Sequence, residues 1–241
     1  SDFGWVKPEW IGIKETKGTD FEEVMGQRRQ YNVAGYTGDA VHIDRWSTPL
    51  SYDEETHFRA TEYLRAQGAS GDQDKPFLLV ASYHHPHEPF WPPQRYWDMY
   101  ADTDIEIAEF PDGFEAGRSQ MDLNLNAYHG VQRSDVRNAD SQRRLRRAYH
   151  GLTSYMDDKV GSLLATLEET GLADNTVVVF ASDHGDMLCE REMVQKRCFY
   201  EWSARVPLLV RFPDKWQAGT AVETPVSLLD LLPTFNDLAG V

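Results

Sequence analysis

Cysteine is scarce in this sequence of 241 residues. The two that occur, Cys189 and Cys198, lie in neither a CxxC nor a Cys/His zinc spacing. Two cysteines are too few for the disulfide framework of a small secreted domain, and the redox compartment stays open. Neither has the surroundings that activate a thiol, so we expect both to be structural.

Basic residues are in the minority. Lysine and arginine number 24 against 39 acidic residues, which gives a formal charge of −15 at pH 7. Nucleic acids and anionic membrane surfaces require clustered positive charge, so we expect neither as a partner. The basic run 143–147 is the exception, and we interpret it as the solvated face of a helix.

Long hydrophobic runs and nucleotide-binding loops are missing too. No stretch reaches the length of a transmembrane helix, and no signal-peptide pattern occurs. Ser1 is not an initiator methionine, so a leader could still precede the chain. The cytoplasm is favoured as the location, and the periplasm stays open. Glycine-rich phosphate-binding motifs are absent, which leaves a nucleotide site unsupported.

Hydrophobic periodicity predicts alternating helices and strands. Helical spacing marks 52–66, 141–167 and 228–238, and apolar runs predict buried strands at 77–82, 176–181 and 206–212. Such alternation predicts an α/β fold with a mostly parallel central sheet flanked by helices. Residues 1–50 lack a sustained period and are expected to form a surface excursion, and the mixed region 90–139 predicts an insertion or lid.

Polar residues directly follow one of these predicted strands. Asp183 and His184 come after the run 176–181, and Gly185 lets the backbone approach a ligand closely. A carboxylate beside an imidazole suits a divalent cation, although aspartate and glycine are also common in ordinary turns. Lys196 lies downstream, either in a solvated loop or as a cation facing an oxyanion.

Three histidines follow another predicted strand. His84, His85 and His87 come after 77–82, with Pro86 in the turn. They could bind zinc, act as general acid and base, or donate hydrogen bonds to an oxyanion. Because ligands of open α/β sheets gather at the carboxyl ends of strands, we expect this cluster to meet the one at Asp183.

Other candidates favour structural roles. Asp157 and Asp158 are neighbours on a predicted helix and point about 100° apart, so they cannot easily hold one ion. Trp91, Tyr96 and Trp97 could surround a quaternary ammonium group such as choline, but aromatic packing is the more common explanation.

The residues around Asp183 carry a specific resemblance. The run 180–188, then Gln195 and Lys196, then 200–207, resembles the sulfatase family of the alkaline-phosphatase superfamily, above all its choline-sulfatase-like and phosphonate-monoester-hydrolase-like members. Four further segments agree with this resemblance: 2–5, 76–89, 147–161 and 226–240. It implies an alkaline-phosphatase-like three-layer domain, of which 1–241 would be the middle to carboxyl-side portion.

The resemblance also implies roles and cofactors. Asp183 and His184 would be ligands of a divalent cation, most often Ca²⁺, with Mn²⁺ or Mg²⁺ as alternatives. His87 and Lys196 would be catalytic and would hold the sulfate group or its bridging oxygen. Cys189 and Glu192 stand where relatives often have glycine, and Arg191 where many have histidine, which leaves the loop geometry and the subfamily open.

The family's nucleophile is a formylglycine made from Cys or Ser in a Cys/Ser-x-Pro/Ala-x-Arg motif. No residue of this sequence has that context. We therefore expect the nucleophile in an amino-terminal part of a longer protein, and we expect the isolated chain to be inactive.

Three functions follow as hypotheses. The first is hydrolysis of a sulfate ester. The second is hydrolysis of a phosphonate or phosphate ester on the same scaffold, and the third is a non-catalytic protein that only binds anions. The expected partner is a small sulfated or phosphorylated substrate, and a homo-oligomer remains an option.

Overall fold

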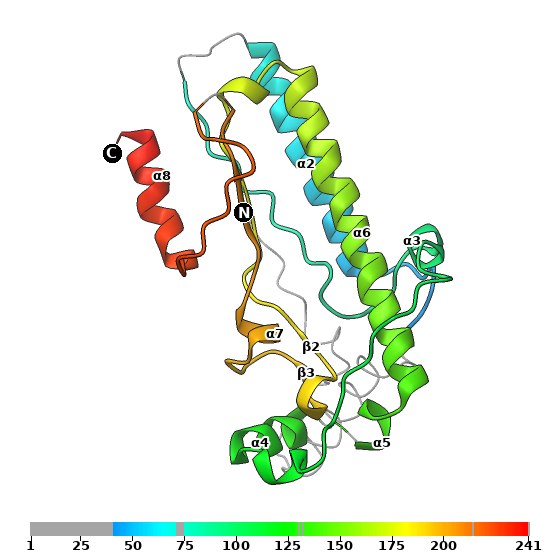
Figure 1. Cartoon of the computed structure of the whole chain (residues 1–241). Helices are drawn as coiled ribbons and strands as arrows, with labels where there is room; N and C mark the ends of the chain where they lie inside the picture. The colour runs from blue at the N-terminus through cyan, green and yellow to red at the C-terminus, as the bar shows by residue number, and fades with distance from the viewer. Residues whose placement is uncertain (1–40, 71–74, 130, 132, 214, 241) are drawn as a thin grey trace, which may run out of the picture.

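Two long helices dominate the molecule (Figure 1). The computed structural model describes residues 41–70, 75–129, 131, 133–213 and 215–240. Helix α2 (Thr48–Ser70) lies beside α6 (Ala139–Glu169). The Asn138 side chain caps the start of α6 by accepting from the backbone N–H of Ser141 at 2.9 Å. These helices confirm the two longest helical segments predicted from the sequence.

Two short antiparallel strand pairs lie beside these helices. Strand β1 (Val178–Ala181) pairs with β4 (Leu208–Arg211), and β2 (Met187–Leu188) pairs with β3 (Val194–Gln195). Both pairs are antiparallel, so the expected parallel pairing is wrong for these strands. The connection explains the difference. Between β1 and β4 the chain forms only the β2–β3 hairpin and the short helix α7 (Glu201–Ala204), so β4 starts at the edge where β1 ends.

Segment 77–82 is the third predicted strand. It has no strand partner among the described residues, so a paired strand is not observed there. It keeps a period of two, because Phe77 and Leu79 pack against Leu64 and Leu167, whereas Leu78 and Val80 are 71% and 74% exposed. The prediction of a buried strand therefore holds for one face of this segment only.

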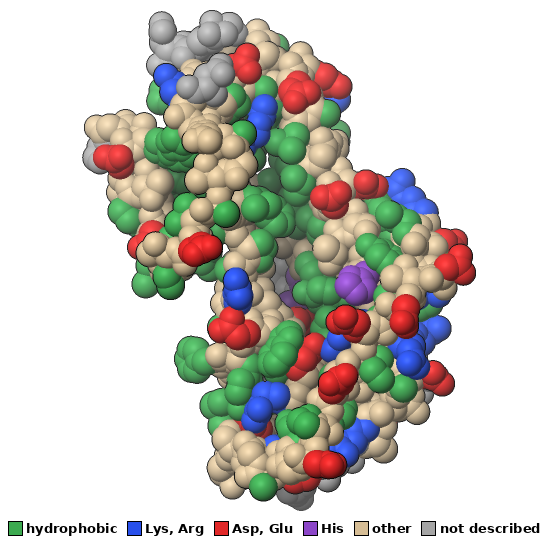
Figure 2. Space-filling view, in the orientation of Figure 1, with side chains coloured by type: hydrophobic (Ala, Val, Ile, Leu, Met, Phe, Trp, Pro, Cys, Tyr) green, Lys and Arg blue, Asp and Glu red, His purple; other side chains and the backbone are tan. Residues whose placement is uncertain are grey.

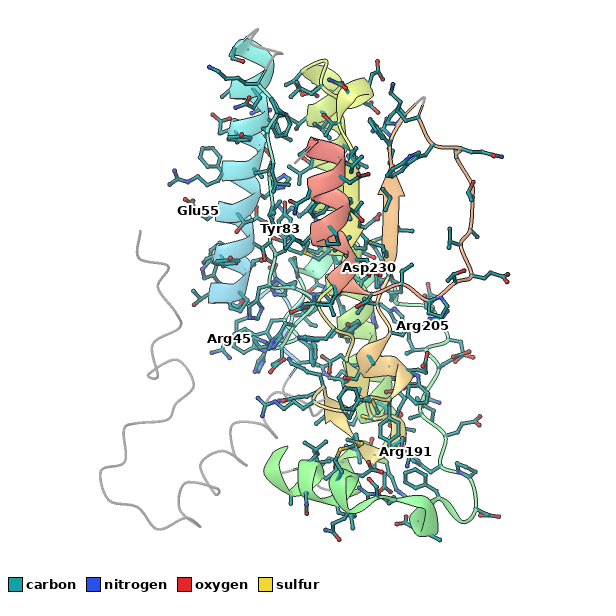
Figure 3. The ribbon with its side chains drawn as sticks, turned by 90° about the vertical axis from the view of Figure 1, so that its left-hand side faces the viewer. Arg45, Glu55, Tyr83, Arg191, Arg205 and Asp230 are labelled. Carbon is teal, nitrogen blue, oxygen red and sulfur yellow. The ribbon has the colours of Figure 1, made fainter. Side chains whose placement is uncertain are left out.

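The carboxyl-terminal helix lies on the other side of β1 and β4 from α2 and α6 (Figures 1 and 3). The turn η6 (Leu228–Asp230) leads into α8 (Leu231–Ala239), and Ser227 and Asp230 form a capping box at its start. The predicted helix at 228–238 is confirmed. Hydrophobic side chains are visible over this part of the surface in Figure 2, and Leu229 and Leu232 are 85% and 68% exposed.

The region 90–139 contains short helical segments: α3 (Gln94–Asp98), η3 (Phe114–Gly117), α4 (Gln120–His129) and α5 (Arg133–Val136). It contributes Phe90 and Val136 to a core with Leu145 and Leu152 of α6. A role as a lid stays a prediction. Of the surface excursion predicted for 1–50, residues 1–40 lie outside the described part. No helix within the described ranges is long and apolar enough to cross a membrane.

Candidate active site

The turn that carries the three histidines is held by one buried carboxylate. Asp53 of α2 is fully buried and accepts hydrogen bonds from the backbone N–H of His84 at 2.6 Å and of His85 at 3.1 Å. The Nδ1 of His85 lies 2.6 Å from the same carboxylate. Because Asp53 satisfies two backbone donors and one ring, it sets the path of the chain into His87.

His87 and Lys196 are in direct contact although 109 residues separate them. The Nε2 of His87 lies 2.5 Å from the Nζ of Lys196. A contact of this kind requires a lone pair on one of the two nitrogens, so one proton lies between them. The geometry therefore brings together the two residues to which the resemblance gives catalytic roles.

Asp183 and His184 lie at the end of β1, as the sequence predicts. The Nδ1 of His184 lies 2.7 Å from the carbonyl oxygen of Gly185 and must donate to it, so Nε2 is the ring nitrogen available to a metal ion in the neutral ring. That Nε2 is 3.6 Å from Oδ2 of Asp183. The His184 and His87 rings meet edge to face with centroids 6.4 Å apart, so the two polar clusters lie at one place.

These atoms fit a partial donor set for a divalent cation. Carboxylate ligands lie about 2.3–2.6 Å from a bound Ca²⁺, so two donors 3.6 Å apart can contact the same ion. The Asp183 side chain is 85% exposed and open to such a ligand. No cluster of three or more His, Cys, Asp or Glu residues suited to a metal occurs within the described ranges, so these two would form part of a larger set.

Gly185 is required by a close approach of two backbone segments. Its N–H donates to the carbonyl oxygen of Ser203 in α7 at 2.8 Å. A Cβ on Gly185 would overlap the carbonyl oxygen of Trp202. The loop after β1 therefore packs directly on α7, and this contact fixes the position of the two candidate metal ligands.

Burial and neighbouring charges shift the pKa values in this site. Burial raises the pKa of Asp186 to about 7, with a further rise from the charges of Glu88 and Glu190. The Oδ1 of Asp186 has no hydrogen-bond partner among the described residues. Burial also lowers the pKa of His84 to about 4, with help from His87 and His85. The pKa of Asp186 therefore lies close to neutral pH, and His84 favours its neutral form there.

For His87, two opposing effects decide the direction of the shift. Burial lowers the pKa of its ring, but the hydrogen bond and charge of Glu88 outweigh that effect. The pKa of His87 is therefore raised above its usual value. This suits a group that supplies a proton during a reaction.

The β2–β3 hairpin, which ends one residue before Lys196, is anchored by buried ion pairs. The Glu192 side chain is 1% exposed and contacts both Arg118, at 2.7 Å, and Arg137. Asp122 of α4, fully buried, contacts Arg191, at 3.1 Å, beside α4 in Figure 3. The region 90–139 thereby fixes the hairpin that presents Lys196.

The backbone of this hairpin has positive φ at both positions where relatives often have glycine. Cys189 and Glu192 have φ values of 82° and 55°, and Arg191 between them has 54°. Residues other than glycine rarely adopt this conformation. The ion pairs of Arg191 and Glu192 compensate for it, and Cys189 and Cys198 are both buried free thiols, as expected.

The remaining candidates are structural. Asp158 accepts a hydrogen bond from the Tyr96 hydroxyl at 2.8 Å. The rings of Trp91, Tyr96 and Trp97 each have a separate arginine over one face, at 4.5, 4.4 and 4.0 Å, so they pack with their own neighbours instead of forming one cage.

Sequence reasoning did not identify the carboxylates that support the site. Asp53 gives no local signal, because its partners lie 31 and 32 residues further along the chain. Glu88 directly follows His87, and a carboxylate next to a catalytic histidine is a signal that could have found it. Asp186 lies two residues after His184 and could have been found in the same way.

Comparison with known proteins identifies the family of the chain. The sequence model described as Sulfatase matches residues 10–241, and the chain belongs to the sulfatase family. It is 37% identical over its whole length to a choline-sulfatase of Rhizobium meliloti and 31% identical, over 86% of the chain, to an arylsulfatase of Clostridium perfringens. The chain spans 44% of the length of each of these relatives.

Solved structures share the fold. A phosphonate monoester hydrolase of Agrobacterium radiobacter has a TM-score of 0.64 at 28% identity, over 77% of this chain and 38% of that one. A putative sulfatase of Bacteroides fragilis has a TM-score of 0.61 at 30% identity, over 78% of this chain and 37% of that one. The expected alkaline-phosphatase-like α/β fold is confirmed, and the family is one of hydrolases that in general use a metal ion and a formylglycine.

Proposed function

We propose that the whole protein hydrolyses a small sulfate ester. The observation that carries this proposal is that two pairs of residues from distant segments lie next to each other. The hydrogen-bonded pair of His87 and Lys196 lies against the strand-end pair of Asp183 and His184, with the two histidine rings 6.4 Å apart. Cationic groups and candidate metal ligands thus converge where a negatively charged sulfate ester group could bind.

The chain's own residues have distinct tasks in this proposal. The cationic pair of Lys196 and His87 neutralises charge on the sulfate oxygens, and the one proton shared between Nζ of Lys196 and Nε2 of His87 passes through Nε2 to the bridging oxygen. That proton moves onto the leaving oxygen as the sulfur–oxygen bond breaks. The leaving group then departs as a neutral alcohol.

Two groups outside these side chains complete the proposal. A divalent cation held by Asp183 and His184, for which we propose Ca²⁺ over Mn²⁺ or Mg²⁺, would stabilise negative charge on the ester group. A formylglycine elsewhere in the whole protein would supply the nucleophile. The cytoplasm is the location we propose, and the oligomeric state is open to measurement by light scattering.

A phosphonate or phosphate ester is the second candidate substrate. The observation that favours it is the TM-score of 0.64 with a phosphonate monoester hydrolase. Rates of the whole protein on matched 4-nitrophenyl sulfate, phosphate and phosphonate esters separate the two. A higher kcat/KM for the sulfate supports our proposal, and a higher value for the phosphonate overturns it.

A purely binding protein is tested separately. The complete sequence of the gene either contains a Cys/Ser-x-Pro/Ala-x-Arg motif or does not. Its presence, together with turnover of any of the three esters, excludes the binding protein. Its absence, with retained affinity for inorganic sulfate, contradicts the hydrolase.

A further inference from the structure

Glu88 contacts both members of the His87–Lys196 pair. Its backbone carbonyl oxygen lies 3.0 Å from Nδ1 of His87. Its carboxylate oxygen Oε2 lies 2.7 Å from the same nitrogen and 3.7 Å from Nζ of Lys196. One residue therefore places two oxygens at the side of the imidazole that faces away from Lys196.

These contacts determine which ring nitrogen of His87 carries a fixed proton. A carbonyl oxygen and an ionised carboxylate oxygen can only accept hydrogen bonds. Nδ1 must therefore carry a hydrogen, which it donates to the backbone carbonyl oxygen of Glu88, while the carboxylate oxygen Oε2 lies at ion-pair distance from the same nitrogen. Nε2 is then the nitrogen that faces Lys196, at 2.5 Å, and that can exchange a proton with a ligand.

The carboxylate of Glu88 also balances charge in a poorly solvated place. The side chains of Glu88 and Lys196 are 14% and 16% exposed, and that of His87 is 32% exposed. Water screens charges weakly at such positions, so a cation needs a nearby counter-ion. Glu88 is the carboxylate in contact with both groups.

We propose that Glu88 is the positioning residue of the active site: it holds the proton on Nδ1 of His87 and keeps Nε2 directed at Lys196 and at the leaving oxygen of the substrate. The catalytic part of this proposal rests on the proposed hydrolase function. The part about the ring of His87 does not, since it concerns the chain's own hydrogen bonds.

The kinetic test compares Glu88→Gln, Glu88→Asp and Glu88→Ala in the whole protein. Glu88→Gln keeps the shape and the backbone carbonyl but removes the counter-charge, whereas Glu88→Asp keeps the charge. We expect Glu88→Gln to lower kcat by about 10-fold to 100-fold with KM changed by less than about threefold, because the histidine is oriented less well in the transition state. Glu88→Asp should recover part of the loss, and Glu88→Ala should be the most impaired.

The leaving group separates positioning of a proton donor from general damage. An alkyl sulfate has a poor leaving group and depends on proton donation, whereas 4-nitrophenyl sulfate depends on it little. The loss in Glu88→Gln should therefore be several-fold larger for the alkyl ester. Equal losses on both esters, or an Asp variant no better than the Gln variant, would overturn the proposal. Glu55→Gln is the matched control, since Glu55 is exposed on the outer side of α2 (Figure 3) and should leave both rates unchanged.

A second readout does not require activity. ¹⁵N spectra of histidine-labelled protein report which ring nitrogen carries hydrogen, and the signal of His87 is assigned by its loss in His87→Asn. We expect a protonated Nδ1 in the wild type and a smaller share of that tautomer in Glu88→Ala, which loses the carboxylate but keeps the backbone carbonyl acceptor. An unprotonated Nδ1 in the wild type would overturn the proposal even in an active enzyme. If the wild type cleaves no ester but shows the expected spectrum, the proposed function fails and the role of Glu88 toward the ring stands.

Discussion

Nζ of Lys196 lies 2.5 Å from Nε2 of His87, which joins the loop after the β2–β3 hairpin to the turn after segment 77–82. Lys196 is 16% exposed and His87 32% exposed, so both can reach a ligand while water is largely displaced from them. A charged side chain in such a place acts strongly on a bound anion, because the surroundings screen it little. This contact makes Lys196 the first residue to test.

We predict that Lys196→Ala lowers kcat of the whole protein on a sulfate ester by about 100-fold to 1,000-fold, the usual effect of removing one preorganised donor to an oxyanion. KM should also rise, because the ammonium group contacts the sulfate before the reaction. Steady-state kinetics measure both quantities. Lys215→Ala, at an exposed position, is the matched control and should retain the wild-type rate.

Asp183 leads to a prediction about metal content. Its carboxylate lies 3.6 Å from Nε2 of His184, and removing it takes away one of two adjacent donors. Asp183→Ala should weaken Ca²⁺ binding by on the order of 100-fold or more. Removing a group that only hydrogen-bonds to a metal ligand already lowers metal affinity by about 10-fold to 100-fold. Isothermal titration and elemental analysis of the whole protein check this. Unchanged metal content would contradict the ligand role, and Asp157→Ala on the exposed face of α6 should bind metal normally.

The parts of the fold that follow from local periodicity could be predicted from the sequence. The helical spacing of Leu145, Ala148 and Leu152 fixes the buried face of α6, and these residues are 1%, 0% and 0% exposed. The strand pairing could not be predicted in the same way. It depends on how the chain returns between Ala181 and Leu208, which periodicity does not report.

Some residues of the candidate site could likewise be predicted from the sequence, and others could not. Residues at strand ends, such as Asp183 and His184, are marked by their place after an apolar run. The contact of His87 with Lys196 required either the structure or a family resemblance, because nothing local links positions 109 residues apart. The supporting carboxylate Asp53 was beyond both kinds of reasoning, since its partners are backbone N–H groups, which the sequence does not distinguish.

Gly185 gives a steric prediction. A Cβ at this position overlaps the carbonyl oxygen of Trp202, and backbone cannot move aside as a flexible side chain can. Gly185→Ala should lower the free energy of unfolding by about 1–3 kcal/mol and weaken metal binding, because the loop that carries Asp183 is displaced. Thermal unfolding and metal titration measure the two effects. Gly161→Ala provides the contrast, because α6 has open space there and alanine should stabilise the helix by up to about 1 kcal/mol.

Asp53 gives a prediction about the histidine turn. Its carboxylate faces three donors in a fully buried position: two backbone N–H groups and the ring of His85. In Asp53→Asn one oxygen becomes an NH₂ group that must face a donor, so we expect a loss of about 3 kcal/mol in the free energy of unfolding. Chemical denaturation measures it. Glu55→Gln makes the equivalent acid-to-amide change at an exposed position and should lower the free energy of unfolding by less than about 0.5 kcal/mol. Similar losses at both positions would contradict this account of the turn.

Asp186 gives a prediction about pH. Burial raises its pKa from 3.8 to about 7, so the folded protein holds this proton more tightly than the unfolded chain does. The stability that this group contributes is therefore present below about pH 4 and is lost as the pH rises through about 7. Asp186→Asn keeps the shape and cannot ionise, so it should be more stable than the wild type at pH 8, by roughly 4 kcal/mol at most, and similar to it at pH 4.

His84 has the opposite dependence and must be separated from this effect. Its pKa is lowered from 6.5 to about 4, so its contribution to stability is present above pH 6.5 and is lost as the pH falls toward 4. The Asp186→Asn protein retains His84, and its stability should therefore rise more steeply from pH 4 to pH 7 than that of the wild type. Urea denaturation at a series of pH values measures both curves. Parallel curves would show that the carboxyl of Asp186 titrates alike in the folded and unfolded states.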